Sequence, residues 1–185
     1  TDHRENPAVC RRIKAKMNKR WRIKARFMQS EIVIEQITDK QTKSNTVRLI
    51  LESLRDWFEL DQAREQYILD SYDQLMIAAL QQGQPVGFLC LKETGKDTVE
   101  LAVMGVLREY QRHGIGRELC EEAKRLAMKE GYSFMQVKTV KMGLYEDYDK
   151  TNLFYQSMGF KEFELFPELW NAQNPCQIYV IALQM

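Results

Sequence analysis

After residue 30, apolar residues either alternate with polar ones or recur at helical spacing, and these two periodicities predict most of the secondary structure. Spacings of three or four residues predict helices over 46–60, 62–71, 117–130 and 151–158. Alternation and short apolar runs predict seven strands, at 31–37, 75–80, 86–91, 99–107, 134–140, 160–166 and 176–183. Strands and helices in this order predict an α/β fold, a mixed sheet with helices on both faces.

The length and composition fit one soluble domain. With 185 residues, 44% of them hydrophobic and 29% charged, the chain has enough apolar surface for a substantial core. It has no apolar run near the roughly 18 residues that a membrane span requires, and residues 1–28 lack the apolar centre of a secretory signal. We therefore expect one domain over 31–185 and no membrane partner.

Cysteine usage argues against a metal centre. The four cysteines are far apart and form no CxxC pair (Cys10, Cys90, Cys120 and Cys176). This spacing disfavours both a zinc site and a disulfide framework, so we expect no metal and a reducing compartment, the cytoplasm.

Positive charge is concentrated at the beginning of the chain. Ten of the 27 Lys and Arg residues lie within 1–30, with only two of the 26 carboxylates, so that segment carries +8 and the remainder −7. The segment 1–30 is either an arm for nucleic acid or acidic surfaces, or an extension without a dedicated partner. We favour the second interpretation, which makes nucleic acid an unlikely partner and places 1–30 outside the core.

Residues 111–116 read Gln-Arg-His-Gly-Ile-Gly and join a predicted strand to a predicted helix. Free N–H groups at a helix start bind phosphate, and glycines let a ligand approach the main chain. The segment is not a Walker loop, because no GxxxxGK[ST] is present, and it is not a dinucleotide fingerprint, because Leu119 stands where the third glycine belongs. On spacing alone, a tight turn without a ligand is an equal alternative.

A second motif resolves this ambiguity. Residues 111–116 match the pattern [RQ]-x-x-G-x-[GA], and Phe154-Tyr155 precede Gly159-Phe160 on a short predicted helix. Together these motifs resemble the GNAT acyltransferase superfamily, over 32–183. The resemblance implies the GNAT acyl-CoA N-acyltransferase fold, with a mixed, mostly antiparallel seven-stranded sheet and about four helices. The segments 103–106 and 166–170 are also similar to a bacterial branch of the superfamily.

The resemblance implies acetyl-CoA as co-substrate and assigns residues to it. Backbone groups of Met104 and Val106 would bind the pantetheine arm, and Arg112 and Arg117 would add charge beside the phosphates. The pyrophosphate would be held by the main-chain N–H groups of Gln111, Arg112, His113, Gly114, Ile115 and Gly116. The chain departs from the family in having Arg108 where proline is common, and Tyr148 where many members have a cofactor-binding asparagine.

Acetyl transfer to an amine needs a base for the amine and an acid for the leaving thiolate. By resemblance Tyr155 is the acid, with Tyr145 and Tyr148 as reserve candidates. Glu100 is the candidate base because a carboxylate is unusual among the apolar residues of 99–103. A salt bridge at Glu100, with ordered water as the base, is the alternative.

In the superfamily the first two helices and the loop after the fifth strand wall the acceptor site. Here those segments combine carboxylates with aromatic residues, of which we take Trp57, Phe58, Tyr145 and Tyr148 as substrate-binding candidates. This combination favours a small cationic amine, unless the carboxylates merely form solvated helix faces. An aminoglycoside, a polyamine, a small amine and a peptide lysine all stay open.

The sequence therefore supports two functions. The first is an acetyl-CoA-dependent N-acetyltransferase that acts on a primary amine by direct attack in a ternary complex. The alternative is a non-catalytic acyl-CoA-binding regulatory or interaction module with a basic arm for nucleic acid. The oligomeric state stays open, a homodimer included.

Overall fold

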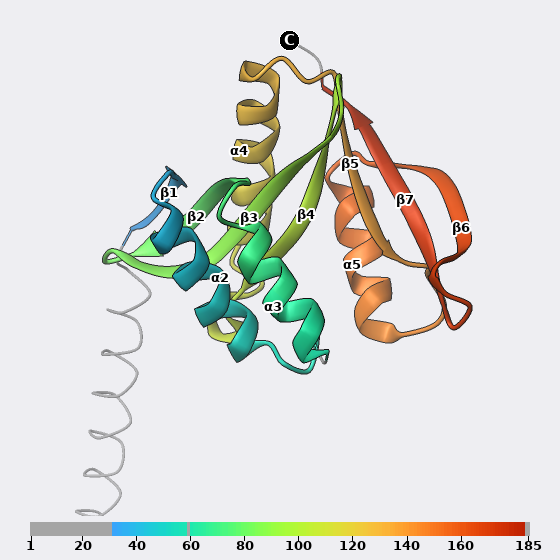
Figure 1. Ribbon diagram of the computed structural model, residues 1–185, viewed down its shortest axis with the longest axis horizontal. Helices are drawn as coiled ribbons and strands as arrows, with labels where there is room; N and C mark the ends of the chain where they lie inside the picture. Colours follow the sequence, from blue (N-terminus) through green and yellow to red (C-terminus); the bar gives the residue numbers. More distant parts are fainter. Residues whose placement is uncertain (1–30, 59, 184–185) are drawn as a thin grey trace, which may run out of the picture. The chain divides into compact units, whose positions relative to one another are not determined.

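The computed structural model describes residues 31–58 and 60–183, and in these ranges seven strands form one sheet (Figure 1). The predicted basic extension, 1–30, lies outside the described residues. In chain order the strands are β1 (Ile32–Ile37), β2 (Leu75–Gln81), β3 (Gln84–Gly95), β4 (Thr98–Val106), β5 (Phe134–Val140), β6 (Lys161–Asn171) and β7 (Asn174–Ala182). The helices are α2 (Lys40–Ser53), α3 (Asp61–Asp70), the 3-10 helix η1 (Arg108–Tyr110), α4 (Ile115–Lys129) and α5 (Glu146–Ser157).

The sheet has the order β1-β2-β3-β4-β5-β7-β6. The pairs β2–β3, β3–β4, β5–β7 and β6–β7 are antiparallel, whereas β4 and β5 at the centre are parallel. Parallel neighbours need a crossover, and α4 supplies it between β4 and β5. The predicted mixed, mostly antiparallel seven-stranded sheet is confirmed. Among the described residues, no helix is long and apolar enough to cross a membrane.

Helices cover both faces of the sheet. Phe88 on β3 belongs to a buried cluster with Val47, Ile50 and Ile68 of α2 and α3. The preceding residue, Gly87, lies instead against Ile115 of α4. Because successive side chains on a strand point to opposite faces, α2 and α3 cover one face and α4 covers the other. The three described cysteines are buried in this core, as small hydrophobic residues (Cys90, Cys120 and Cys176).

Two helices begin earlier than the sequence pattern predicts. We expected a helix over 46–60, but α2 spans Lys40–Ser53, and its start is capped by Asp39, which accepts a hydrogen bond from the Thr42 N–H. We expected a helix over 151–158, but α5 begins at Glu146. Its first turn carries Glu146, Asp147 and Asp149, whose charges stabilise a helix N-terminus without contributing to apolar periodicity. Polar first turns therefore hid both starts.

Candidate active site

The parallel strands β4 and β5 separate half-way along their length. Their ladder pairs 98–101 with 134–137 and, within the described residues, goes no further, although β4 continues to Val106 and β5 to Val140. On the other edge of β4, Cys90 pairs with Val103 but Leu91 pairs with Leu101, which leaves Ala102 as an extra residue. Such a bulge bends the strand that contains it. The bend at Ala102 accounts for the separation.

The free edge of β4 presents backbone groups to this gap. In an antiparallel ladder alternate residues bond to the partner strand, and Leu107 N–H donates to Val86 of β3. Leu107 and Gly105 therefore point toward β3, and the backbone groups of Met104 and Val106 point toward the gap. The Val106 carbonyl there accepts a hydrogen bond from the Gln111 side chain, at 2.8 Å. Met104 and Val106 are the two residues predicted to bind the pantetheine arm. The carbonyl oxygen of Val106 already accepts a hydrogen bond, so its N–H is the group that faces the gap without this partner.

The predicted phosphate loop leads directly into α4. Arg112 and Gly114 both adopt left-handed backbone conformations, with φ of 65° and 90°. Gly114 is the N-cap, and no side chain caps the helix there, in contrast to Asp39 at the start of α2. The first N–H groups of α4 are consequently available to an anion at the positive end of the helix dipole. This geometry suits the predicted pyrophosphate site.

The remaining loop residues divide into supporting and exposed positions. Ile115 is buried under β3, and a Cβ built on Gly116 would lie 3.6 Å from Phe154 of α5 and 4.0 Å from Met104. Gly116 therefore lies where α4, α5 and β4 meet. Arg112, His113 and Arg117 are exposed, and within the described residues neither arginine forms an ion pair. Both guanidinium groups are free to neutralise phosphate charge.

Tyr155 lies on α5 next to Phe154, whose ring packs near Gly116 at the start of α4. Its ring contacts those of Phe154 and Phe160, with centroids 5.5 and 5.9 Å away. Burial raises the pKa of Tyr155, and interactions with Cys120 and then Tyr67 raise it further. Cys120 belongs to α4 and Tyr67 to α3, on opposite faces of the sheet. The pKa of this phenol is thus affected by groups on both faces of the sheet.

Tyr67 is a site residue that the sequence did not reveal. It is half-buried on α3, its ring meets Phe58 edge-on at 6.1 Å, and burial, Tyr148 and Glu100 raise its pKa, in that order. The structure thus groups Tyr67 with Tyr148, Glu100 and Tyr155, although these residues come from three different elements, α3, β4 and α5. Only the tertiary fold reveals this grouping.

Glu100 forms an ion pair. Its Oε2 accepts from Lys138 Nζ at 2.5 Å and from Gln136 Nε2 at 3.3 Å, both on β5. The side chains of Lys138 and Glu100 are only 28% and 13% exposed. Of the two interpretations of Glu100, the salt bridge is observed. Lys138 was missed, although the alternation of 134–140 does expose Gln136 and Lys138 on one face of the strand.

The start of α5 is fastened to the end of β5. Buried Asn152 donates from Nδ2 to the carbonyl oxygens of Val140 and Tyr148, at 3.0 and 2.7 Å. Tyr148 in turn packs against Tyr145, with ring centroids 5.9 Å apart. Asn152 was also missed by sequence reasoning. These contacts fix the position of Tyr148, which is the residue that stands in place of the asparagine of many GNAT members.

The other acceptor candidates have mainly structural surroundings. Trp57 and Phe58 are half-buried, and Phe58 packs against the core cluster. Most carboxylates of these segments are engaged: Glu52 and Glu65 by Arg48, Asp56 by Arg108, Asp61 by Arg64, and Glu146 and Asp147 by Lys150. The predicted concentration of negative charge is largely neutralised within the chain.

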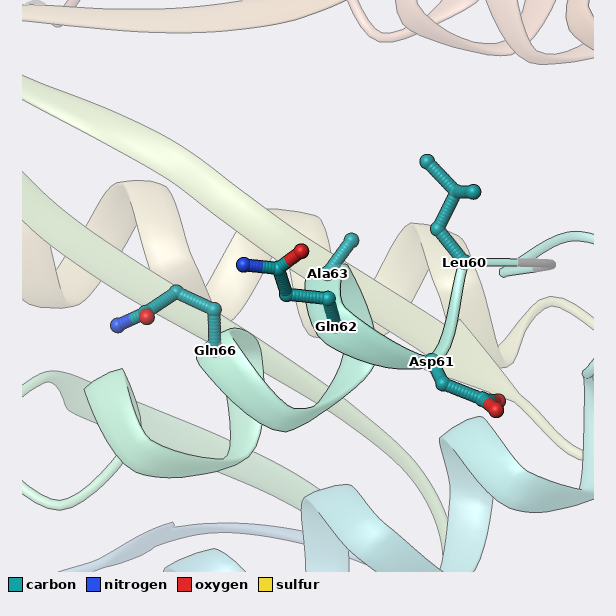
Figure 2. A pocket seen from close by; sticks show the side chains of 5 residues that line it. All are labelled: Leu60, Asp61, Gln62, Ala63 and Gln66. Carbon is teal, nitrogen blue, oxygen red and sulfur yellow. The ribbon is translucent and has the colours of Figure 1, made fainter.

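A surface hollow of about 390 Å³ lies at the start of α3, lined by Leu60, Asp61, Gln62, Ala63 and Gln66. Figure 2 shows Leu60 and Ala63 projecting to the same side of the helix, whereas Asp61 points away from them. Ala63 and Tyr67 are four residues apart and share a helix face. The hollow therefore borders the side of α3 that carries Tyr67, and Ala63 lines it on that side.

Known proteins are similar to this chain in sequence and in fold. A family profile described as an acetyltransferase (GNAT) domain matches residues 72–162, which include β4, the phosphate loop, α4 and α5. The chain belongs to the GNAT superfamily. A Chlorobaculum tepidum protein described as an uncharacterised N-acetyltransferase is 27% identical over 134 residues, which are 71% of this chain and 68% of the relative. This GNAT chain is accordingly an N-acetyltransferase.

Solved structures agree in fold. A GNAT family acetyltransferase from Desulfovibrio desulfuricans superposes with a TM-score of 0.68 and 17% identity, over 83% of this chain and all of that one. An aminoglycoside 6'-N-acetyltransferase complexed with coenzyme A superposes with a TM-score of 0.64 and 19% sequence identity, over 83% of this chain and 98% of that one. At these identities the likeness establishes the GNAT fold, and the acceptor has to be argued from this chain's own residues.

Proposed function

We propose that this GNAT protein transfers the acetyl group of acetyl-CoA to a small primary amine, by direct attack within a ternary complex. The observation that carries the proposal is the position of Tyr155. Its ring packs on Phe154, which lies near Gly116 at the start of α4 and near Met104 of β4, the strand that borders the gap between β4 and β5. A donor and an acceptor bound on opposite sides of that gap would meet at this hydroxyl.

The donor side is supported by the loop and the free strand edge. The uncapped start of α4 and the uncommitted side chains of Arg112 and Arg117 suit the pyrophosphate of coenzyme A. Backbone groups of Met104 and the Val106 N–H, which point into the gap, suit the amides of the pantetheine arm. One GNAT structural neighbour holds coenzyme A, which supports the same ligand here.

The chemistry requires one bond to form and one to break. The amine nitrogen attacks the thioester carbonyl carbon, a C–N bond forms, and the C–S bond breaks as the tetrahedral intermediate collapses. Tyr155 donates its proton to the departing thiolate, and its raised pKa keeps the hydroxyl protonated at neutral pH. A phenol without another hydrogen-bond partner among the described residues is free to make that donation.

The nitrogen must also lose a proton. One Glu100 oxygen already accepts hydrogen bonds from Lys138 and Gln136 and is occupied by these two donors. The proton therefore leaves either to the other oxygen of Glu100 or to ordered water. On the acceptor side, the rings of Tyr67 and Tyr148 suit a protonated amine through cation–π contact before it is deprotonated.

Release of free coenzyme A in the presence of candidate amines tests the proposal. Purified protein is mixed with acetyl-CoA and a panel of aminoglycosides, polyamines, small amines, amino acids and lysine peptides, and new thiol is measured with a thiol-reactive dye. We expect amine-dependent release with at least one class, and mass spectrometry should find the product 42 Da heavier, the mass that an acetyl group adds in place of hydrogen. Acetyl-CoA binding without release for any class would contradict the proposal.

A further inference from the structure

The Lys138–Glu100 ion pair indicates which charged group the acceptor carries in addition to its amine. Lys138 Nζ lies 2.5 Å from the Glu100 carboxylate, and both side chains are largely removed from solvent. Within the described residues, Glu100 is the one carboxylate that pairs with Lys138. Charges that are partly buried depend on their partners, because an uncompensated one is costly.

The pair lies on the acceptor side of the sheet. Tyr67 of α3 interacts electrostatically with both Glu100 and Tyr148. Lys138 and Gln136 are two residues apart on β5, so both project to the face that Glu100 occupies. The phosphate loop and α4 belong to the opposite face. The pair is thus part of the acceptor wall, separate from the groups that suit coenzyme A.

The charges around the pair narrow the choice of acceptor. If an amine carrying only positive charge approached Glu100, it would compete with Lys138 and leave that cation without a counter-ion. A molecule with both an ammonium and a carboxylate avoids this loss, because each end can replace one member of the pair. The carboxylates of Glu65, Asp61 and Asp147 on α3 and α5 do not alter this balance, since they are engaged by Arg48, Arg64 and Lys150.

We propose that the acceptor is an amino acid or a closely similar zwitterion, whose carboxylate binds Lys138 and whose amine lies beside Glu100. This inference rests on the proposed acetyl transfer. Lys138 is a specificity residue in this account and takes no part in the bond changes. The amine nitrogen is acetylated as described above, and the carboxylate stays unchanged.

The test compares matched substrates on the wild-type protein: phenylalanine with phenethylamine, lysine with cadaverine, and β-alanine with ethylamine. We expect at least one amino acid to exceed its carboxylate-free partner in kcat/KM by about tenfold or more, the effect of one charge-assisted hydrogen bond. Lys138→Met should reduce that ratio to near one by lowering kcat/KM for the amino acid alone. Lys138→Arg should retain the preference, and Lys141→Met, which removes an exposed charge nearby, should not change it.

Each outcome separates the inference from the function on which it rests. If no amine of any class causes release of coenzyme A, the proposed function is wrong and the inference fails with it. The Lys138–Glu100 pair itself would be unaffected by that result. Efficient acetylation of carboxylate-free amines, with amino acids no better, would overturn the inference and leave the function intact. The wild-type comparison needs no variant, so it decides the question even if Lys138→Met does not fold.

Discussion

The Gln111 side chain donates a hydrogen bond to the main-chain carbonyl oxygen of Val106 over 2.8 Å. This contact joins the first residue of the loop motif to the last residue of β4, on the edge that faces the gap. It gives a physical reason for Gln or Arg at that position of the motif, because both side chains carry N–H donors. The loop conformation that exposes the N–H groups of α4 depends on this anchor.

Gln111→Leu keeps the approximate size of the side chain and removes its donor. We expect affinity for coenzyme A to fall about fivefold, because the loss of one hydrogen bond costs about 1 kcal/mol of loop ordering. Titration calorimetry with coenzyme A measures the change, and Gln111→Arg should bind like the wild type. Equal affinity of Gln111→Leu and wild type would show that the contact does not shape the cofactor loop.

Gly114 and Gly116 should respond differently to alanine. Gly114 has φ of 90°, which an alanine adopts only under strain of about 1–2 kcal/mol. Gly116 lies within α4, and a Cβ there meets Phe154 at an ordinary 3.6 Å. We predict that Gly114→Ala weakens coenzyme A binding and lowers the melting temperature, whereas Gly116→Ala does neither. A destabilised Gly116→Ala would contradict the described packing of α4 on α5.

Gly105 allows α2 to pack closely on β4. A Cβ at this position would lie 2.9 Å from Ile50 Cγ2 and 3.2 Å from the Phe88 ring. We expect Gly105→Ala to lower the free energy of unfolding by about 1–3 kcal/mol through overpacking. Gly95→Ala is the matched control, since nothing lies within 4 Å of its Cβ position. Urea denaturation of both variants should separate them, and equal stabilities would count against this contact.

The buried hydroxyl of Tyr155 should make stability depend on alkaline pH. Burial raises its pKa above the ordinary 10.0, so above pH 10 the unfolded chain loses this proton while the folded chain keeps it. The folded state then binds more protons, and the free energy of unfolding falls as pH rises, by up to about 1.4 kcal/mol per pH unit from this group. Below pH 10 both states are protonated and the group has no effect.

Urea denaturation at several pH values from 9 to 11.5 measures this slope. Tyr155→Phe should show a shallower decline than the wild type, because its side chain cannot ionise. Tyr145 is exposed, so Tyr145→Phe should retain the wild-type slope. A Tyr155→Phe slope equal to that of the wild type would mean that the Tyr155 hydroxyl is accessible to solvent in the folded protein.

Local sequence patterns predicted the strands of the sheet and the turn of the loop, because both depend on residues that are close together in the sequence. The alternation over 134–140 coincides with β5, and the loop motif contains its own turn residues. The starts of α2 and α5 were missed, since their first turns are polar and are stabilised by Asp39 or by helix-dipole charges.

Contacts between distant residues could not be predicted in this way. The Lys138–Glu100 pair joins residues 38 positions apart, and Tyr67 comes within electrostatic range of Glu100 and Tyr148 only after α3 packs on the sheet. Acidic residues that suggested a cationic acceptor proved to have basic partners, such as Arg48 for Glu65. Composition gives the number of charges, whereas the fold determines which of them are neutralised.

The turnover of Tyr155→Phe tests the central claim most directly. With an acceptor identified by coenzyme A release, we predict that kcat falls by about a hundredfold or more, the usual contribution of a general acid, while coenzyme A affinity is unchanged. Tyr132 follows the C-terminal end of α4, far along the helix from the loop, and its hydroxyl donates a hydrogen bond to Glu93. Tyr132→Phe should therefore keep full activity. If Tyr155→Phe turns over like the wild type, Tyr155 is not the acid and the proposed mechanism is wrong.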